Sequence, residues 1–284
     1  MSAESISAST QTASPLPRPF YDDWPWGTRT HARALWHWHG SLAQAAPNAE
    51  PGAETSLDAF FEKEQQRVLD QRPLRIISDE VRAAAYAACE AHDLPVRLLG
   101  AQVAAARRLH GPLRFADAAD LDAFSRQWAA AHARLLAGLL DLDRGLRLQY
   151  IDEVARGFLF IGRLVRLPQD LEQHDHLFIP ESDLEQAGVT VDLLRRGERT
   201  EAVRRLLWKQ MIRARDALGQ AQPLARELSW RHRQRFKRWW YGALELIAEI
   251  ERCDYDLWSA PVELSTFRRV QIYLQAFFGK AASQ

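Results

Sequence analysis

The chain has 284 residues, of which 47% are hydrophobic, so it can bury a proper core in one large domain or two small ones. Lys and Arg together number 37, as do Asp and Glu, and this zero net charge argues against a protein whose overall field attracts nucleic acid. The sequence contains no run of about 18 apolar residues and begins without the charged and apolar regions of a signal peptide. We therefore expect neither a membrane-spanning helix nor a secretory signal.

The first 19 residues are rich in Ser, Ala, Thr and Pro, and they are predicted to form a disordered tail (1–19) before a folded domain over residues 20–280. Cys89 and Cys253 lie far apart within helical patterns. This favours buried thiols in a reducing cytoplasm over a disulfide framework.

Helical periodicity dominates the domain. Apolar residues recur at helical spacing after Ser56, which can cap a helix, and again after Ser78. A third such pattern follows Pro95, and proline suits the first turn of a helix. Further helices are predicted over residues 117–140, 146–165, 201–218, 227–253 and 264–278. Strand-like alternation is nowhere sustained. The sequence therefore predicts an all-α fold, a single domain of roughly eight or nine helices.

One segment carries a recognisable pattern. The apolar run that starts at Gly157 leads into a polar stretch that closes on Leu-Phe-Ile-Pro180. It resembles the signature of the squalene/phytoene synthase family, in which a helix ends in Asn-Ile-Leu-Arg-Asp, a second Asp follows, and a basic loop leads to Tyr-Leu-Pro. Segments similar in order and spacing to others of the family are found at 92–95, 113–117, 121–129, 182–189 and 255–275. The resemblance covers residues 57–278 and implies the isoprenoid synthase bundle, with helices around a central cavity.

The resemblance also implies where magnesium ligands would stand. In the family, two Asp-rich motifs hold the Mg²⁺ ions that bind the diphosphate leaving group. Counted back from Pro180, the second pair of aspartates falls on Leu167 and Leu171. The first pair should follow a family helix that the segment at 33–39 resembles, and it falls on Ala46 and Pro47. None of these side chains offers an oxygen donor. We therefore expect the frame of the family without its metal site and without a cofactor; Mg²⁺ is expected only if the chain is an enzyme.

The resemblance implies three substrate-binding candidates. Arg166 keeps the family's Arg, Arg163 replaces its Asn, and Phe124 stands where the family has Tyr. Two guanidinium groups can bind an anionic head group bidentately without a metal. The alternative for the arginines is an ion pair with Asp152, Glu153 or a distant carboxylate.

A polar stretch beside the signature helix, interpreted as a loop, holds weaker metal candidates: Asp170, Glu172, His174 and His176. His-x-His with nearby carboxylates suits Zn²⁺ or another borderline metal. The alternative is a solvated loop. The alternating Trp and His residues at 36–39 favour packing over ligation.

Residues 230–241 interleave basic and aromatic side chains. Arg231, Arg235 and Arg238 share one helix face, with Trp239 near its edge. Such a face suits an anionic membrane surface or a protein partner, and a solvated helix face is the alternative. Without a nucleic-acid motif, binding of nucleic acid is not expected. The core stripe of the same helix is predicted to consist of Phe236, Trp240, Ala243 and Ile247.

Three functions remain open. The first is a non-catalytic family member that binds an isoprenoid, another lipid or a protein partner; the altered signature helix resembles the branch of the family that assists assembly of respiratory complex I. The second is an active prenyltransferase or terpene synthase with relocated ligands or a metal-free anion site. The third is an unrelated all-α interaction protein. We favour the first, located in the cytoplasm, with a peripheral position on the inner face of a membrane as the alternative.

Overall fold

The computed structural model describes residues 24–44, 80–142 and 144–278. Within these ranges every regular element is a helix, and the one extended pairing is an isolated parallel bridge between Leu113 and His176. The predicted all-α fold is therefore confirmed. The N-terminal tail, the helix after Ser56 and the first-motif positions Ala46 and Pro47 lie outside the described residues. The single domain over 20–280 stays a prediction.

The described residues form two compact units. Residues up to 112 and residues 123–152 are called here the N-terminal unit, and residues 113–122 with 153–278 are called the C-terminal unit. Two helices, α6 (Ala118–Ser125) and α8 (Leu146–Val165), run from one unit into the other.

The N-terminal unit is built around α2, which packs against α4, α5 and α7. Its elements are α2 (Trp26–Gln44), α4 (Glu80–Ala91), α5 (Arg97–Arg108), the π-helical turn η4 (Arg126–Ala130) and α7 (Ala131–Gly138). The core face of α2 includes Leu35 and Trp38, and the Trp38 ring meets Tyr86 of α4 edge to face. The helix predicted over 117–140 is confirmed over residues 118–138, where α6, η4 and α7 follow one another without a gap; the π-helical turn η4, with its wider hydrogen-bond spacing, was not predicted.

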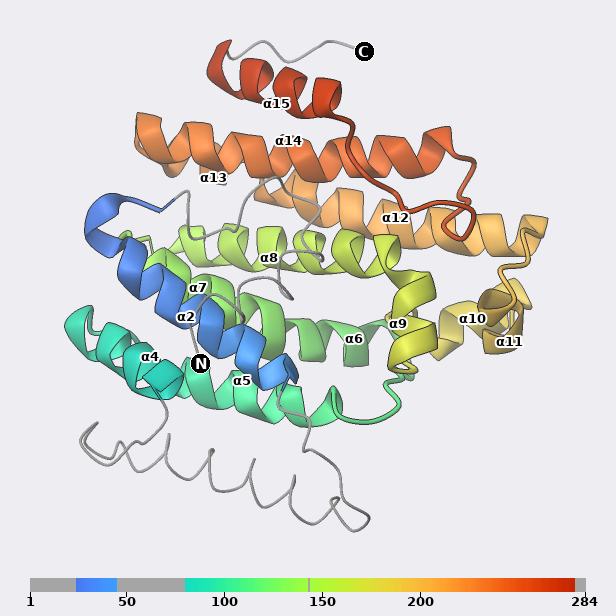
Figure 1. Ribbon diagram of the computed structural model, residues 1–284, viewed down its shortest axis with the longest axis horizontal. Coiled ribbons are helices and arrows are strands. Elements are labelled where there is room, and N and C mark those ends of the chain that lie inside the picture. The colour runs from blue at the N-terminus through green and yellow to red at the C-terminus, as the bar shows by residue number, and fades with distance from the viewer. Residues whose placement is uncertain (1–23, 45–79, 143, 279–284) are drawn as a thin grey trace, which may run out of the picture. The chain divides into compact units, whose positions relative to one another are not determined.

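The C-terminal unit is a set of long helices in which α12 packs on α10 and α14, and α15 lies along α14 (Figure 1). Its further elements are α9 (Leu167–Gln173), α10 (Glu181–Ala187), α11 (Val191–Arg195), α12 (Glu201–Ala221), α13 (Leu224–Glu227), α14 (Trp230–Arg252) and α15 (Thr266–Phe278). The helix predicted over 146–165 has the bounds of α8, and α12, α14 and α15 begin and end within about three residues of their predicted bounds. Thr200 caps α12, since its hydroxyl accepts a hydrogen bond from the Val203 amide at 3.2 Å.

The helix α14 buries Ala243 and Ile247 of the predicted stripe, but a different tryptophan. Trp239 is only 7% exposed and lies one turn from buried Ala243, whereas Phe236 and Trp240 are half-buried. Placing Trp239 at the edge of the basic face was therefore wrong. Of the three arginines predicted for that face, Arg231 is exposed, whereas Arg235 and Arg238 are half-buried.

None of the described helices combines the length and the apolar character needed to cross a membrane. Cys89 and Cys253 are both free, as predicted, and burial raises the pKa of the Cys89 thiol to about 12.

Two glycines of α8 provide a matched test of how closely this helix packs against α12. A Cβ added at Gly157 would lie 2.7 Å from Cγ of Leu218 and 3.2 Å from its backbone nitrogen, whereas nothing lies within 4 Å of a Cβ at Gly162. Overpacking costs about 1–3 kcal/mol, and alanine gains about 1 kcal/mol over glycine inside a helix. We therefore expect Gly157→Ala to lower the free energy of unfolding and Gly162→Ala to raise it by about 0.5–1 kcal/mol, as measured by urea denaturation. Equal shifts in the two variants would contradict the close approach.

Candidate functional site

The signature segment folds as two helices that meet at Arg166. The helix α8 ends at Val165, α9 begins at Leu167, and Arg166 between them has φ −97° and ψ 7°. Pro168 lies in the first turn of α9, where its missing N–H group is tolerated, but it cannot continue α8. Asp170 therefore lies on α9 and not in the predicted loop.

Leu167 and Leu171 are core residues. They are 2% and 4% exposed, one turn apart on α9. Glu172, also on α9 and not in a loop, is exposed. The two positions at which the family resemblance implies aspartates thus face the apolar interior and carry no oxygen donor.

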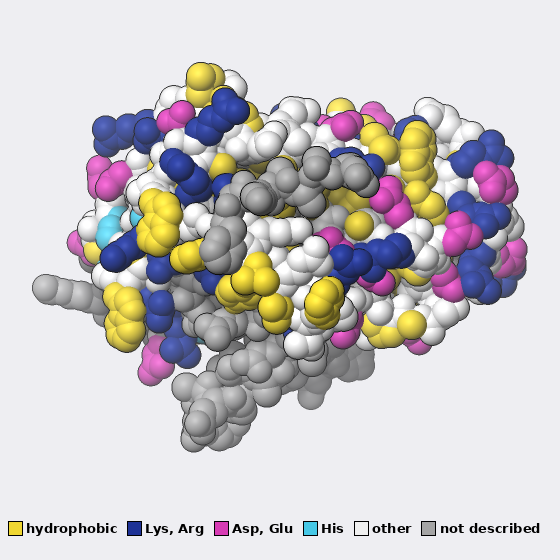
Figure 2. All heavy atoms as spheres, turned by 90° about the horizontal axis from the view of Figure 1, so that it is seen from above, with side chains coloured by type: hydrophobic (Ala, Val, Ile, Leu, Met, Phe, Trp, Pro, Cys, Tyr) yellow, Lys and Arg dark blue, Asp and Glu magenta, His cyan; other side chains and the backbone are white. Residues whose placement is uncertain are grey.

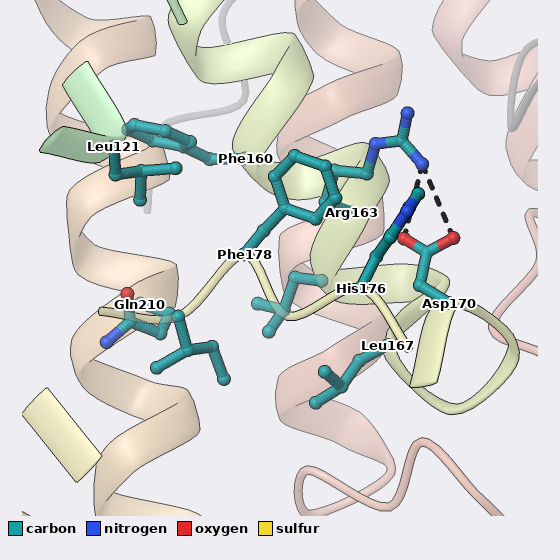
Figure 3. A pocket seen from close by; sticks show the side chains of 10 residues that line it. Leu121, Phe160, Arg163, Leu167, Asp170, His176, Phe178 and Gln210 are labelled. Carbon is teal, nitrogen blue, oxygen red and sulfur yellow. Dashed lines mark hydrogen bonds and ion pairs between the residues drawn. The ribbon is translucent and has the colours of Figure 1, made fainter. Parts of the chain in front are cut away.

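Asp170 is the buried carboxylate of this helix, at 1% exposure. Nη1 of Arg163 lies 3.3 Å from both of its carboxylate oxygens, and Nε of Arg166 lies 3.7 Å from Oδ1 (Figure 3). The guanidinium group of Arg163 also lies over the Phe178 ring, 4.6 Å from its centroid. The ion-pair alternative for the arginines is therefore confirmed, with Asp170 in place of Asp152 or Glu153.

A small pocket adjoins this cluster. Figure 3 shows Phe160 and Leu121 at one side and the Arg163–Asp170 pair at the other, with the Phe178 ring between them and His176 beside the pair. The cavity volume is ≈ 20 Å³. That is room for about one water molecule and far too little for a prenyl chain.

The turn after α9 is fixed by Asp175. This residue has a positive φ of 53°, and its carboxylate binds Arg114 and Arg195. The hydrogen bonds from Arg114, and then the charges of both arginines, hold the pKa of Asp175 below its usual range. The Leu113 amide donates to the Asp175 carbonyl, and the Leu177 amide donates to the Leu113 carbonyl, which closes the parallel bridge.

A second buried carboxylate, Asp183 on α10, was not singled out from the sequence. It binds Nζ of Lys209 at 2.8 Å, Nε2 of Gln210 at 2.8 Å and Nη2 of Arg213 at 3.0 Å. Burial raises its pKa, but the hydrogen bonds and charges from α12 outweigh burial and hold the pKa below the usual range. Its partners all come from α12, so Asp183 fastens α10 to α12. Only its place in the Asp-Leu-x-x-x-Gly-Val segment hinted at a role.

The aromatic and histidine residues of the N-terminal unit form a stack. The His39 ring lies 3.9 Å from Trp128 and 4.2 Å from His132 between ring centroids, and Nδ1 of His39 is 2.8 Å from Gln102. Packing of the residues at 36–39 is thus confirmed. Phe124 is 1% exposed and stacks on Trp128.

His132 follows the π-helical turn, a type of irregularity that often marks functional sites. It is 6% exposed, and neither ring nitrogen has a hydrogen-bond partner in the part of the chain that the structure describes. Burial, and then the neighbouring His39, lowers the pKa of His132 well below its usual value, so its ring is neutral at physiological pH. No sequence pattern pointed to this residue beyond its helical position.

A model of the squalene/phytoene synthase family matches residues 25–272. The chain belongs to the squalene/phytoene synthase family. Solved structures agree in fold. A dehydrosqualene synthase in complex with ligand is similar at a TM-score of 0.78 and 13% identity, covering 97% of this chain and 94% of that chain. Squalene synthase HpnC from Alicyclobacillus acidocaldarius is similar at a TM-score of 0.74 and 20% identity, covering 89% and 94% of the two chains. YisP from Bacillus subtilis subsp. subtilis strain 168 is similar at a TM-score of 0.57 and 16% identity, covering 86% of this chain and 98% of that chain. No curated protein sequence matches the chain.

Membership of the squalene/phytoene synthase family raises the question whether α9 can hold Mg²⁺, and its residues do not fit that ion. Leu167 and Leu171 have no donor atoms, and Asp170 already binds two arginines. The weaker candidates fit no better, since Asp170 is paired with the arginines and Glu172 is exposed, so that neither is a buried carboxylate free to join His174 and His176. Among the described residues, no three His, Cys, Asp or Glu side chains converge in a way that could hold a metal ion.

Proposed function

We propose that this chain is a non-catalytic member of the squalene/phytoene synthase family, which binds an isoprenoid, another lipid or a protein partner. The observation that carries the proposal is the burial of Leu167 and Leu171 at the positions where the family resemblance implies aspartates. A hard cation such as Mg²⁺ needs oxygen ligands, and an aliphatic side chain supplies none. The chain would therefore keep the fold of the family without its means of ionising a prenyl diphosphate.

The arginines of α8 give the proposed binding function a polar contact. Arg163 and Arg166 share the single carboxylate of Asp170, so this cluster keeps one net positive charge. Both guanidinium groups are partly exposed, at 22% and 33%. In this proposal they bind an anionic head group directly, with two parallel hydrogen bonds where a metal would otherwise mediate. The lipid chain would lie outside the small pocket, whose volume of ≈ 20 Å³ is too small for it.

The proposal is tested by measuring whether the chain turns over prenyl diphosphates. The full-length chain is incubated with farnesyl or geranylgeranyl diphosphate and Mg²⁺, and released pyrophosphate and apolar products are measured, with squalene synthase HpnC as the positive control. We expect no consumption above the buffer blank. Consumption of either substrate would instead establish the alternative, a prenyltransferase or terpene synthase with relocated ligands.

A further inference from the structure

The C-terminal helix α15 exposes a row of large apolar side chains. Phe267, Val270, Leu274 and Phe277 are 75%, 53%, 53% and 61% exposed. Their spacing of three or four residues places them on one face of the helix. Ile272 and Ala276, on another face, are buried, and α15 packs on α14. The helix thus has two apolar faces, of which one is covered by the protein.

The first turn of α14 extends this surface. Trp230 is 60% exposed, and its ring meets Phe277 edge to face with 6.3 Å between the centroids. The surface formed by Trp230, Phe267, Val270, Leu274 and Phe277 is called here the C-terminal patch. Soluble monomers rarely expose a contiguous row of this kind without a use for it.

Positive charge accompanies the C-terminal patch. Residues 230–244 of α14 include five Lys or Arg and no Asp or Glu, and α15 adds two Arg and no acid, although the whole chain is neutral. Nε of Arg268 lies 3.2 Å from Glu245. The guanidinium group of Arg238 lies over the Tyr273 ring of α15. Figure 2, which looks onto the molecule from the side of α15, shows exposed apolar side chains with Lys and Arg side chains around them.

We propose that the C-terminal patch binds the surface of a membrane that contains anionic lipids. The apolar row would enter the boundary between head groups and acyl chains, and the surrounding cations would meet the lipid phosphates. Trp and Arg are the residues that favour this boundary. The charge decides between a bilayer and a second copy of the chain, since two copies meeting through this patch would bring two basic surfaces together. The inference does not depend on whether the chain is catalytic.

The experiment is co-sedimentation of the full-length chain with phosphatidylcholine vesicles, with or without about one third phosphatidylglycerol, at low and high salt. Burying one Leu or Phe side chain is worth about 1.5–3 kcal/mol, and 1.4 kcal/mol is about tenfold in affinity. We expect preference for the anionic vesicles, weaker binding at high salt, and at least about tenfold weaker binding for the double variant Leu274→Ser, Phe277→Ser. Because both side chains are exposed, the variant should melt like the parent protein.

Matched controls separate the patch from general hydrophobicity and charge. Trp208→Ser, at a position on α12 that is 51% exposed, should leave vesicle binding unchanged. Arg231→Glu should weaken binding to anionic vesicles and leave any residual binding to neutral vesicles unaltered. Binding that survives the double variant, or no sedimentation with either vesicle, would overturn the proposal. So would a dimer in analytical ultracentrifugation that the double variant abolishes, since the patch would then contact a second copy.

Discussion

Leu171→Asp is expected to destabilise the protein by about 3–5 kcal/mol, the range for a buried charge left without a partner. Leu171 is 4% exposed and stands where the family resemblance implies the second aspartate of the motif. If α9 still had the geometry of a metal site, an aspartate there would restore a ligand. If the position has become core, the aspartate is only a buried charge.

Leu171→Ala is the control that separates lost packing from buried charge. Truncating a buried leucine to alanine costs about 2–5 kcal/mol through lost contacts and the cavity. The aspartate variant should therefore unfold at a lower urea concentration than the alanine variant, with or without Mg²⁺. The same comparison applies to Leu167, where nearby Arg163 would soften the effect of the charge. Stabilisation of the double variant Leu167→Asp, Leu171→Asp by millimolar Mg²⁺ would contradict the account, because the helix would then still present a cation site.

Asp170→Ala is expected to lower the free energy of unfolding by about 3 kcal/mol. This is the lower end of the cost of breaking a buried ion pair by removing one partner. The carboxylate is 1% exposed and serves both Arg163 and Arg166. Because the guanidinium groups are 22% and 33% exposed, they can turn partly toward water, which limits the loss. The free energy of unfolding from urea denaturation measures the effect.

A mutant cycle distinguishes this cluster from a simple surface ion pair. Arg163→Met with Arg166→Met leaves Asp170 buried without its two cations and should cost more than Asp170→Ala. Combining all three changes should recover part of the loss, because no charge is then stranded. Losses that simply add would show that the three side chains do not interact energetically.

The long helices could be predicted from the sequence because each presents one clear apolar stripe. The helix α8 is the best case, since its apolar period runs unbroken from Leu146 to Val165. The short helix α9 after it was missed, because residues 167–173 were interpreted as part of a polar loop, although Pro168 suits the first turn of a helix. The π-helical turn at 126–130 has no such signal, because Ala-rich sequence fits either spacing of hydrogen bonds.

The candidate site could be predicted in part. Counting back from Pro180 placed the aliphatic residues at Leu167 and Leu171, and the structure buries both. The partner of the arginines was missed, because the prediction of a loop put Asp170 in solvent. The buried carboxylate of Asp183 depends on contacts between α10 and α12, which no local pattern encodes.

Helices with aromatic residues on more than one face were the hardest to predict. In α14 the stripe chosen from the sequence included Trp240, whereas the structure buries Trp239. In α15 two apolar faces are present, and only tertiary packing decides that Ile272 is buried and Phe277 is 61% exposed.

The central claim, that this chain lacks the magnesium–diphosphate site implied for its family, is tested most directly by titrating pyrophosphate into the full-length protein in a calorimeter with and without Mg²⁺. The account predicts that Mg²⁺ adds no affinity, so that any binding comes from guanidinium groups such as those of Arg163 and Arg166 and weakens as salt is raised. Binding of pyrophosphate that appears only with Mg²⁺, or that Mg²⁺ strengthens about tenfold or more, would contradict it.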